Sequence, residues 1–156
     1  MALEIVSLEH LPNSHKVYVA LFRDVQNAAF LHQQLLARNP QFEYAFIDAS
    51  VIADAYRRYG ISPSTKDLIV VKVTFPGEDG AEPLTHDQIW EHLKSNVEGE
   101  AVSITDDQIS TTTDVPKVRK YYKLNGLKWL DDIKDEKVKQ KEMESLVIGA
   151  MALRGV

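Results

Sequence analysis

The five histidines are the side chains best suited to metal binding or proton transfer, and none of them lies in a known catalytic spacing. His86 and His92 are six residues apart, so on one helix they point in different directions and cannot bind one metal ion together. No H-E-x-x-H sequence occurs. His32 borders an apolar stripe, where a boundary histidine is more common than a functional one, and His10 and His15 flank a turn. We therefore expect no metal site.

Nucleophilic and phosphate chemistry also lack a recognisable pattern. The chain has no cysteine, which excludes cysteine nucleophiles and thiolate metal sites. It has no G-x-S-x-G elbow, no Walker A sequence and no G-x-G-x-x-G loop. The acid pair Asp106-Asp107 lies in a polar stretch, where solvated surface is the expected role of carboxylates. We expect no catalytic residue and no cofactor.

A basic and aromatic segment at residues 117–123 is a candidate for RNA contact. Its cations are Lys117, Arg119, Lys120 and Lys123, and two tyrosines lie among them. Cations interleaved with aromatic rings suit phosphate contact and base stacking. The alternative is a solvated helix that offsets an acidic surface, which is the more common role of such a run.

Residues 146–153 predict a helix that is apolar on nearly every side, and such a helix must be covered on more than one face. One stripe consists of Met143, Leu146, Val147, Ala150 and Met151. The residues that face another direction are Ile148, Ala152 and Leu153. Either the helix is enclosed by the fold, or its second face docks in a groove of a partner. The spacing leaves both alternatives open.

Strand and helix patterns that must position these segments run along the whole chain. β-Branched and aromatic residues predict strands at residues 4–8, 16–22, 44–47, 68–75 and 101–104. Helical spacing is seen at residues 25–38 and 51–59, a capping box at Thr85 opens another helix, and Asp114-Val115-Pro116 starts a fourth. The highly charged residues 131–144 are expected to form a solvated helix or linker. Together these predict a mixed α/β fold, with a single central, largely antiparallel sheet flanked by helices and a C-terminal apolar helix.

Length and composition set the broad class. The chain has 156 residues, of which 44% are hydrophobic, and a formal net charge of −5. We expect one domain over residues 1–156 that builds its core without disulfides. The acidic balance argues against a general nucleic-acid binder. No signal peptide and no membrane-spanning run is evident, so a cytoplasmic or nuclear protein that is not secreted is expected.

Several short motifs, in order along the chain, resemble one known family. LFRDVQNA at residues 21–28 resembles the signature LF-x-DV-x-NA of the small KEOPS (EKC) subunits, the PRPK-binding (TPRKB) family. FID at residues 46–48, DAYRRYGI at 54–61 and RKYYKL at 119–124 resemble the family's FID, DAF-x-x-FGI and KKIYKL. The ending ALRGV resembles the terminus of fungal members.

The middle of the chain departs from this family. Its members carry a helix, a basic Thr/Arg-rich stretch and a strand between FID and DAF-x-x-FGI, whereas here residues 49–52 alone separate Asp48 from Ala53. A family segment is therefore expected to be missing around residues 49–53. The helix predicted at residues 51–59 then spans the junction.

The resemblance implies a non-catalytic regulatory subunit of the KEOPS/EKC complex. Such a subunit binds the PRPK-like kinase-like ATPase and supports its activity, and through the complex it meets the threonylcarbamoyl-transferase subunit and tRNA. The implied process is tRNA threonylcarbamoyladenosine modification in nucleus and cytoplasm, with a link to telomere maintenance. The partner surface expected from it is Leu146, Val147, Ala150, Met151 and Leu153. The alternative is a stand-alone RNA-binding module that uses residues 117–123.

Overall fold

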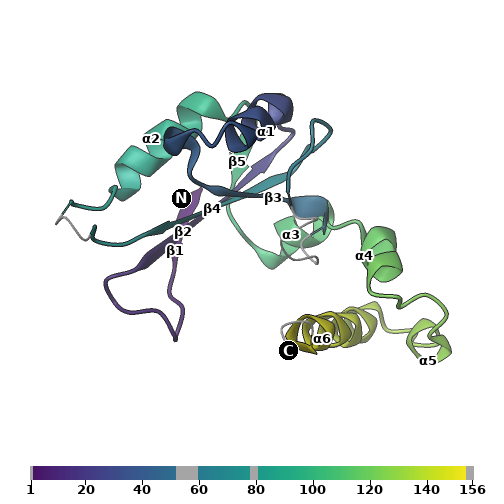
Figure 1. Ribbon diagram of the computed structural model, residues 1–156. Coiled ribbons are helices and arrows are strands. Elements are labelled where there is room, and N and C mark those ends of the chain that lie inside the picture. Colours follow the sequence, from purple (N-terminus) through teal and green to yellow (C-terminus); the bar gives the residue numbers. More distant parts are fainter. Residues whose placement is uncertain (1, 52–59, 78–80, 154–156) are drawn as a thin grey trace.

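The fold is built on a five-stranded sheet in which every pair of strands is antiparallel (Figure 1). The computed structural model describes residues 2–51, 60–77 and 81–153. The strands are β1 (Leu3–Val6), β2 (Lys16–Arg23), β3 (Ala45–Asp48), β4 (Leu68–Thr74) and β5 (Glu100–Val102). Their order is β1-β2-β4-β3, and β5 pairs with the end of β2 along the edge that β1 also uses. The expected mixed α/β class with an antiparallel sheet is confirmed.

Two helices, α1 (Ala28–Leu36) and α2 (His86–Asn96), cover one face of the sheet (Figure 1). The capping box of α2 is present, since the Thr85 hydroxyl accepts a hydrogen bond from the backbone N–H of Gln88, whose side chain binds the backbone of Thr85. The sequence predicts a helix over residues 25–38, and α1 begins three residues later, at Ala28. The backbone N–H groups of Val25 and Gln26 donate to carbonyls of distant loops, so this stretch joins the sheet end to the loops around it.

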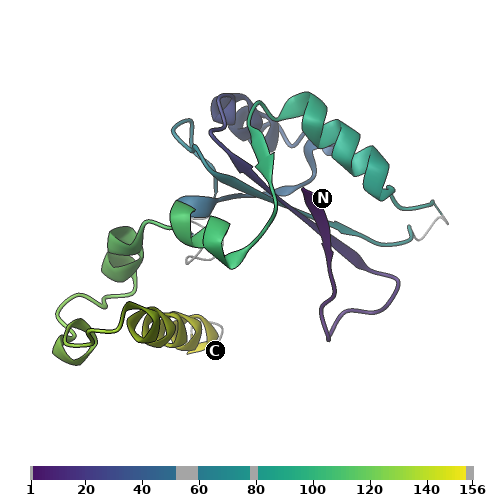
Figure 2. The ribbon, with the colours of Figure 1, turned by 180° about the vertical axis from the view of Figure 1, so that it is seen from behind.

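The remaining helices follow the sheet or connect its strands. They are η1 (Pro40–Phe42), η2 (Ala49–Val51), α3 (Asp106–Thr112), α4 (Val115–Tyr121), α5 (Lys128–Asp131) and α6 (Glu136–Leu153). Seen from behind, α3 lies on the side of the sheet away from α1 and α2, and α4 to α6 lie beyond it (Figure 2). The helix predicted at residues 51–59 falls outside the described residues, apart from its first position.

The sequence pattern missed α3. Thr105 caps it by accepting a hydrogen bond from the backbone N–H of Gln108, and Asp106 and Asp107 occupy its first turn. Acidic side chains there stabilise the positive end of the helix dipole. The acid pair that was assigned to solvated surface is therefore also a helix start.

Three apolar clusters hold the described residues together. The sheet–helix core lies between the sheet and α1 and α2, and includes Tyr18, Ala20 and Phe22 of β2. The back-face cluster lies on the other side of the sheet, around Leu21 and Ile69. The helical-unit cluster is formed within α4 to α6 and the turns between them, and among the described residues it shares no member with the other two.

Candidate protein-binding site

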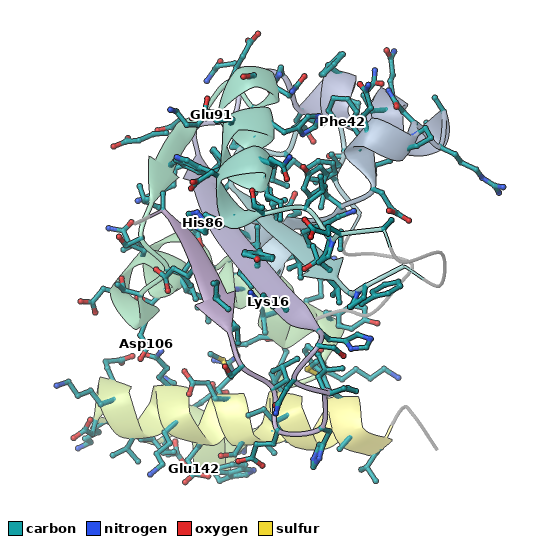
Figure 3. The ribbon with its side chains drawn as sticks, turned by 90° about the vertical axis from the view of Figure 1, so that its left-hand side faces the viewer. Lys16, Phe42, His86, Glu91, Asp106 and Glu142 are labelled. Carbon is teal, nitrogen blue, oxygen red and sulfur yellow. The ribbon has the colours of Figure 1, made fainter. Side chains whose placement is uncertain are left out.

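Helix α6 is the longest helix in the part of the chain that the structure describes, and its first half is strongly charged. The Asp135 carboxylate accepts hydrogen bonds from the backbone N–H groups of Lys137 (2.9 Å) and Val138 (3.2 Å), which caps the helix start. Figure 3 shows Glu142 on the side of α6 that faces away from the sheet. The charged residues 131–144 are mostly exposed, so the solvated helix expected for this stretch is confirmed from residue 136 onward.

One stripe of α6 is turned inward. Met143, Leu146, Val147 and Ala150 are half-buried and pack against the helical-unit cluster. The buried members of this cluster are Val118, Tyr122, Leu124 and Leu130. Four of the five residues assigned to the inner stripe therefore lie where the helical spacing predicts.

Three other apolar side chains of α6 are left open by the described residues. Ile148 is 66% exposed, Met151 46% and Leu153 77%, and we call these three residues the α6 outer surface. Ile148 and Met151 lie one turn apart, and no charged residue interrupts residues 146–153. An exposed apolar strip of this kind fits a groove on another protein.

The residues expected at the partner surface fall into two groups. Leu146, Val147 and Ala150 face the helical-unit cluster, whereas Met151 and Leu153 are exposed. Ile148 belongs with the exposed group, although the expected surface left it out. The spacing already separates Ile148 from the packed stripe of the helix, and this signal could have added Ile148 to the expected partner surface.

The basic segment forms α4 and the turn after it, as the Asp114 start predicts. Lys117, Lys120 and Lys123 are exposed. Lys117 and Lys120 share one side of α4, whereas Lys123 lies in the turn after the helix, with a positive φ of 56°. Arg119 is half-buried; its guanidinium forms an ion pair with Asp131 and donates to the carbonyl of Leu124. Three of the four cations thus face solvent, while Arg119 joins α4 to α5.

His86 and His92 form hydrogen bonds or ring contacts with neighbouring residues. The His92 ring stacks on Tyr44 and lies 3.0 Å from its hydroxyl through Nδ1. Burial, together with the nearby Lys72 charge, lowers the pKa of His92. His86 lies 3.2 Å from the Asp87 carboxylate and 3.2 Å from the Leu3 carbonyl, and these hydrogen bonds raise its pKa.

Across the part of the chain that the structure describes, no group of three or more His, Cys, Asp or Glu side chains is placed to hold a metal ion. No helix in that part combines the length and apolar character needed to cross a membrane. The prominent chemical features there are the apolar α6 outer surface and the exposed lysines of α4 and of the turn after it.

Known proteins resemble this chain over its whole length. "EKC/KEOPS complex subunit CGI121" of Gibberella zeae is 72% identical, with all of both chains covered. The protein of that name from Neurospora crassa is 40% identical, again over all of both chains. The one from Schizosaccharomyces pombe is 24% identical over 70% of this chain and 83% of its own.

The alignment with the Gibberella zeae protein spans 197 positions, 41 more than the 156 residues of this chain. A family model described as "Kinase binding protein CGI-121" matches in two parts, residues 22–55 and residues 50–155. These matches extend the resemblance seen in the short motifs to nearly the whole sequence. The chain therefore belongs to the CGI-121 family of kinase binding proteins.

Proposed function

We propose that this chain is a non-catalytic regulatory subunit of the EKC/KEOPS complex that binds the complex's kinase-like ATPase through the end of α6. The observation that carries the proposal is the α6 outer surface, where Ile148, Met151 and Leu153 expose apolar side chains on a helix already held by its contacts with the helical-unit cluster. The family description as kinase binding and the relatives' names as complex subunits agree with it.

The apolar residues of α6 have two proposed roles, which are direct contact with the partner and support of the helix. Ile148, Met151 and Leu153 contact the partner directly. Leu146, Val147 and Ala150 fix the position of the helix by packing on the helical-unit cluster. A preorganised helix loses little conformational freedom on binding, which favours affinity.

Through the complex, the proposed role is to support tRNA threonylcarbamoyladenosine modification in nucleus and cytoplasm, together with telomere maintenance. In this role the chain meets the threonylcarbamoyl-transferase subunit and tRNA only as part of the assembly. Lys117, Lys120 and Lys123 are the residues we propose for tRNA contact, because they are exposed on α4 and the turn after it. Arg119 contributes by holding the carbonyl of Leu124 and the carboxylate of Asp131.

Calorimetric titration with the purified kinase-like subunit tests the proposal. Burying the exposed surface of one Ile or Met side chain contributes about 1–2 kcal/mol. Ile148→Glu and Met151→Glu should therefore each raise the Kd about five- to thirtyfold, while circular dichroism and the urea midpoint stay unchanged. Glu142→Gln, on the same helix, is the matched control and should bind like the unmutated chain. Absence of binding by the unmutated chain, or unchanged Kd in both glutamate variants, would refute the proposal.

The stand-alone RNA-binding alternative makes a different prediction. It requires that the chain alone bind single-stranded RNA, with an affinity that falls steeply as salt rises. It also requires that Lys117→Ala and Lys120→Ala each weaken that binding. A filter-binding titration at two salt concentrations separates the two functions, because the subunit role requires no affinity for RNA in the isolated chain.

A further inference from the structure

The turn between α4 and α5 contains an asparagine that is followed directly by a glycine, Asn125-Gly126. Both residues are exposed, and the turn lies at the edge of the molecule, away from the sheet (Figure 1). Gly126 has a φ of +87°, and an added Cβ atom there would meet nothing within 4 Å. The backbone on the glycine side of Asn125 is therefore open to solvent.

An asparagine side chain reacts with the backbone nitrogen of the next residue. That nitrogen bonds to the Cγ atom of the asparagine and loses its proton, while the side-chain nitrogen takes up a proton and leaves as ammonia. Water then opens the five-membered succinimide ring. Opening at one carbonyl gives aspartate, and opening at the other gives isoaspartate, in which the main chain runs through Cβ and Cγ. Glycine is the most favourable next residue, because a Cβ atom would hinder the approach of its nitrogen.

Hydrogen bonding fixes the two sides of this turn and leaves its centre unbound. Within the described residues, no hydrogen bond involves the side chain of Asn125 or the backbone N–H of Gly126. On one side, the N–H of Leu124 donates to the carbonyl of Arg119 (2.8 Å). On the other side, an N–H of α5 donates to the carbonyl of Leu127 (3.0 Å). The reacting pair can therefore change conformation while its neighbours keep their contacts.

Three of the other four asparagines are protected by their bonds or by the residue that follows them. The Asn27 side chain donates to the carbonyl of Asn96 (2.8 Å) and accepts from a backbone N–H. Asn39 is followed by Pro40, which has no N–H proton to lose. Asn96 lies in α2, where its side chain donates to a carbonyl (2.8 Å), and a β-branched residue, Val97, follows it.

Asn13 is the closest comparison with Asn125. It is exposed and lies in a turn, where the N–H of His15 donates to the carbonyl of Pro12 (2.9 Å). The residue after it is Ser14, whose Cβ atom hinders ring closure. The two asparagines thus differ mainly in the residue that follows, so Asn13 serves as an internal control.

We propose that Asn125 is a site of spontaneous deamidation, and that isoaspartate at this position loosens the helical unit formed by α4 to α6. Leu124 and Leu127 flank the reacting pair, and both belong to the packing of the helical-unit cluster. Isoaspartate adds one backbone carbon between these leucines, which lengthens the chain by about 1.5 Å. Because interiors are close-packed, the two side chains cannot both keep their positions.

The new negative charge is a smaller disturbance than the longer backbone. Residue 125 is exposed, so a carboxylate there stays hydrated. The exposed cations Lys123 and Lys128 lie two and three residues away along the chain, and exposed charges interact weakly. Aspartate and isoaspartate at this position should therefore differ in their effect on stability.

The first experiment measures the rate of conversion in the full chain. The purified protein is warmed in mildly alkaline buffer and digested with trypsin at intervals, and cleavage after Lys123 and Lys128 releases residues 124–128 as one peptide. Replacement of the amide by a carboxyl group raises its mass by about one dalton, and chromatography separates aspartate from isoaspartate. Asn125 should convert at least about tenfold faster than Asn13. Asn125→Gln should abolish the conversion, because its longer side chain would have to close a six-membered ring.

The second experiment measures what the modification does to the fold. The isoaspartate form, purified after the incubation, should melt at least about 3 °C below the untreated chain when unfolding is followed at Trp129. Asn125→Asp carries the charge without the longer backbone and should melt within about 1 °C of the untreated chain. The Asn125→Gln chain, incubated in the same way, should keep its Tm, which controls for other damage.

Two outcomes would overturn the proposal. One is conversion of Asn125 no faster than that of Asn13, which would show that the folded turn prevents ring closure. The other is an isoaspartate form that melts with the untreated chain, which would show that Leu124 and Leu127 tolerate the longer backbone. Neither measurement involves the kinase-like subunit or RNA, so the proposed function can fail or hold separately.

Discussion

Gly99, in the turn between α2 and β5, is packed more closely than an alanine allows. A Cβ atom there would lie 2.9 Å from the carbonyl oxygen of Arg23 and 3.0 Å from the Cγ2 atom of Val25. Arg23 is paired with Glu100 in the sheet, so its carbonyl cannot move without disturbing β2 and β5. Overpacking against fixed backbone costs about 1–3 kcal/mol. We expect Gly99→Ala to lower the free energy of unfolding by that amount.

Urea unfolding monitored by far-UV circular dichroism measures this loss. Gly149→Ala is the matched control, because Gly149 lies in α6 and a Cβ atom there meets nothing within 4 Å. Alanine is the better helix former by about 1 kcal/mol, so the control should stabilise α6. The two glycine-to-alanine changes should therefore have opposite signs. A neutral or stabilising Gly99→Ala would refute the argument from close approach.

Three further predictions follow from the caps, histidines and clusters. Thr85→Ala removes the cap of α2 and should cost about 1 kcal/mol in urea unfolding; an unchanged midpoint would contradict this. By NMR titration, His92 should take up its proton at lower pH than His86, because burial lowers the pKa of His92 below the usual 6.5 and hydrogen bonding raises that of His86. Because the unfolded chain binds a proton at His92 more readily than the folded chain does, the fold loses stability as the pH falls below about 6.5 and keeps it above that pH. Coincident titration of the two rings would contradict this. Leu130→Ala should cost about 2–5 kcal/mol and shift the unfolding monitored at Trp129 to lower urea, since Leu130 is buried in the helical-unit cluster; an unshifted transition would show that the cluster adds little.

Local sequence signals were sufficient where one residue type dominates a segment. The β-branched run at residues 68–75 gives β4, and the Thr85 capping box gives α2. α3 was missed because its Thr105 cap stands before two aspartates and few apolar residues, so hydrophobic spacing had little to detect. The short α5 was also missed, since a single turn has no periodicity.

The candidate site was predictable in outline. Helical spacing separated the two directions of α6, but it could not say which one meets α4, since that depends on contacts distant in the chain. The same limit applies to Arg119, whose partner Asp131 lies twelve residues away on another helix. The sequence alone therefore does not distinguish Arg119 from the exposed lysines of the basic segment.

The separation of the helical-unit cluster from the sheet has a consequence for the speed of folding. Its members come from one continuous stretch, whereas the pairing of β2 with β4 joins residues as far apart as Lys16 and Thr74. Local contacts close short loops and form quickly, while distant strand pairing must first overcome the entropy of a long loop. The α4–α6 region is therefore expected to gain its structure before the sheet does, with Trp129 and Trp90 as natural fluorescent reporters of the two events.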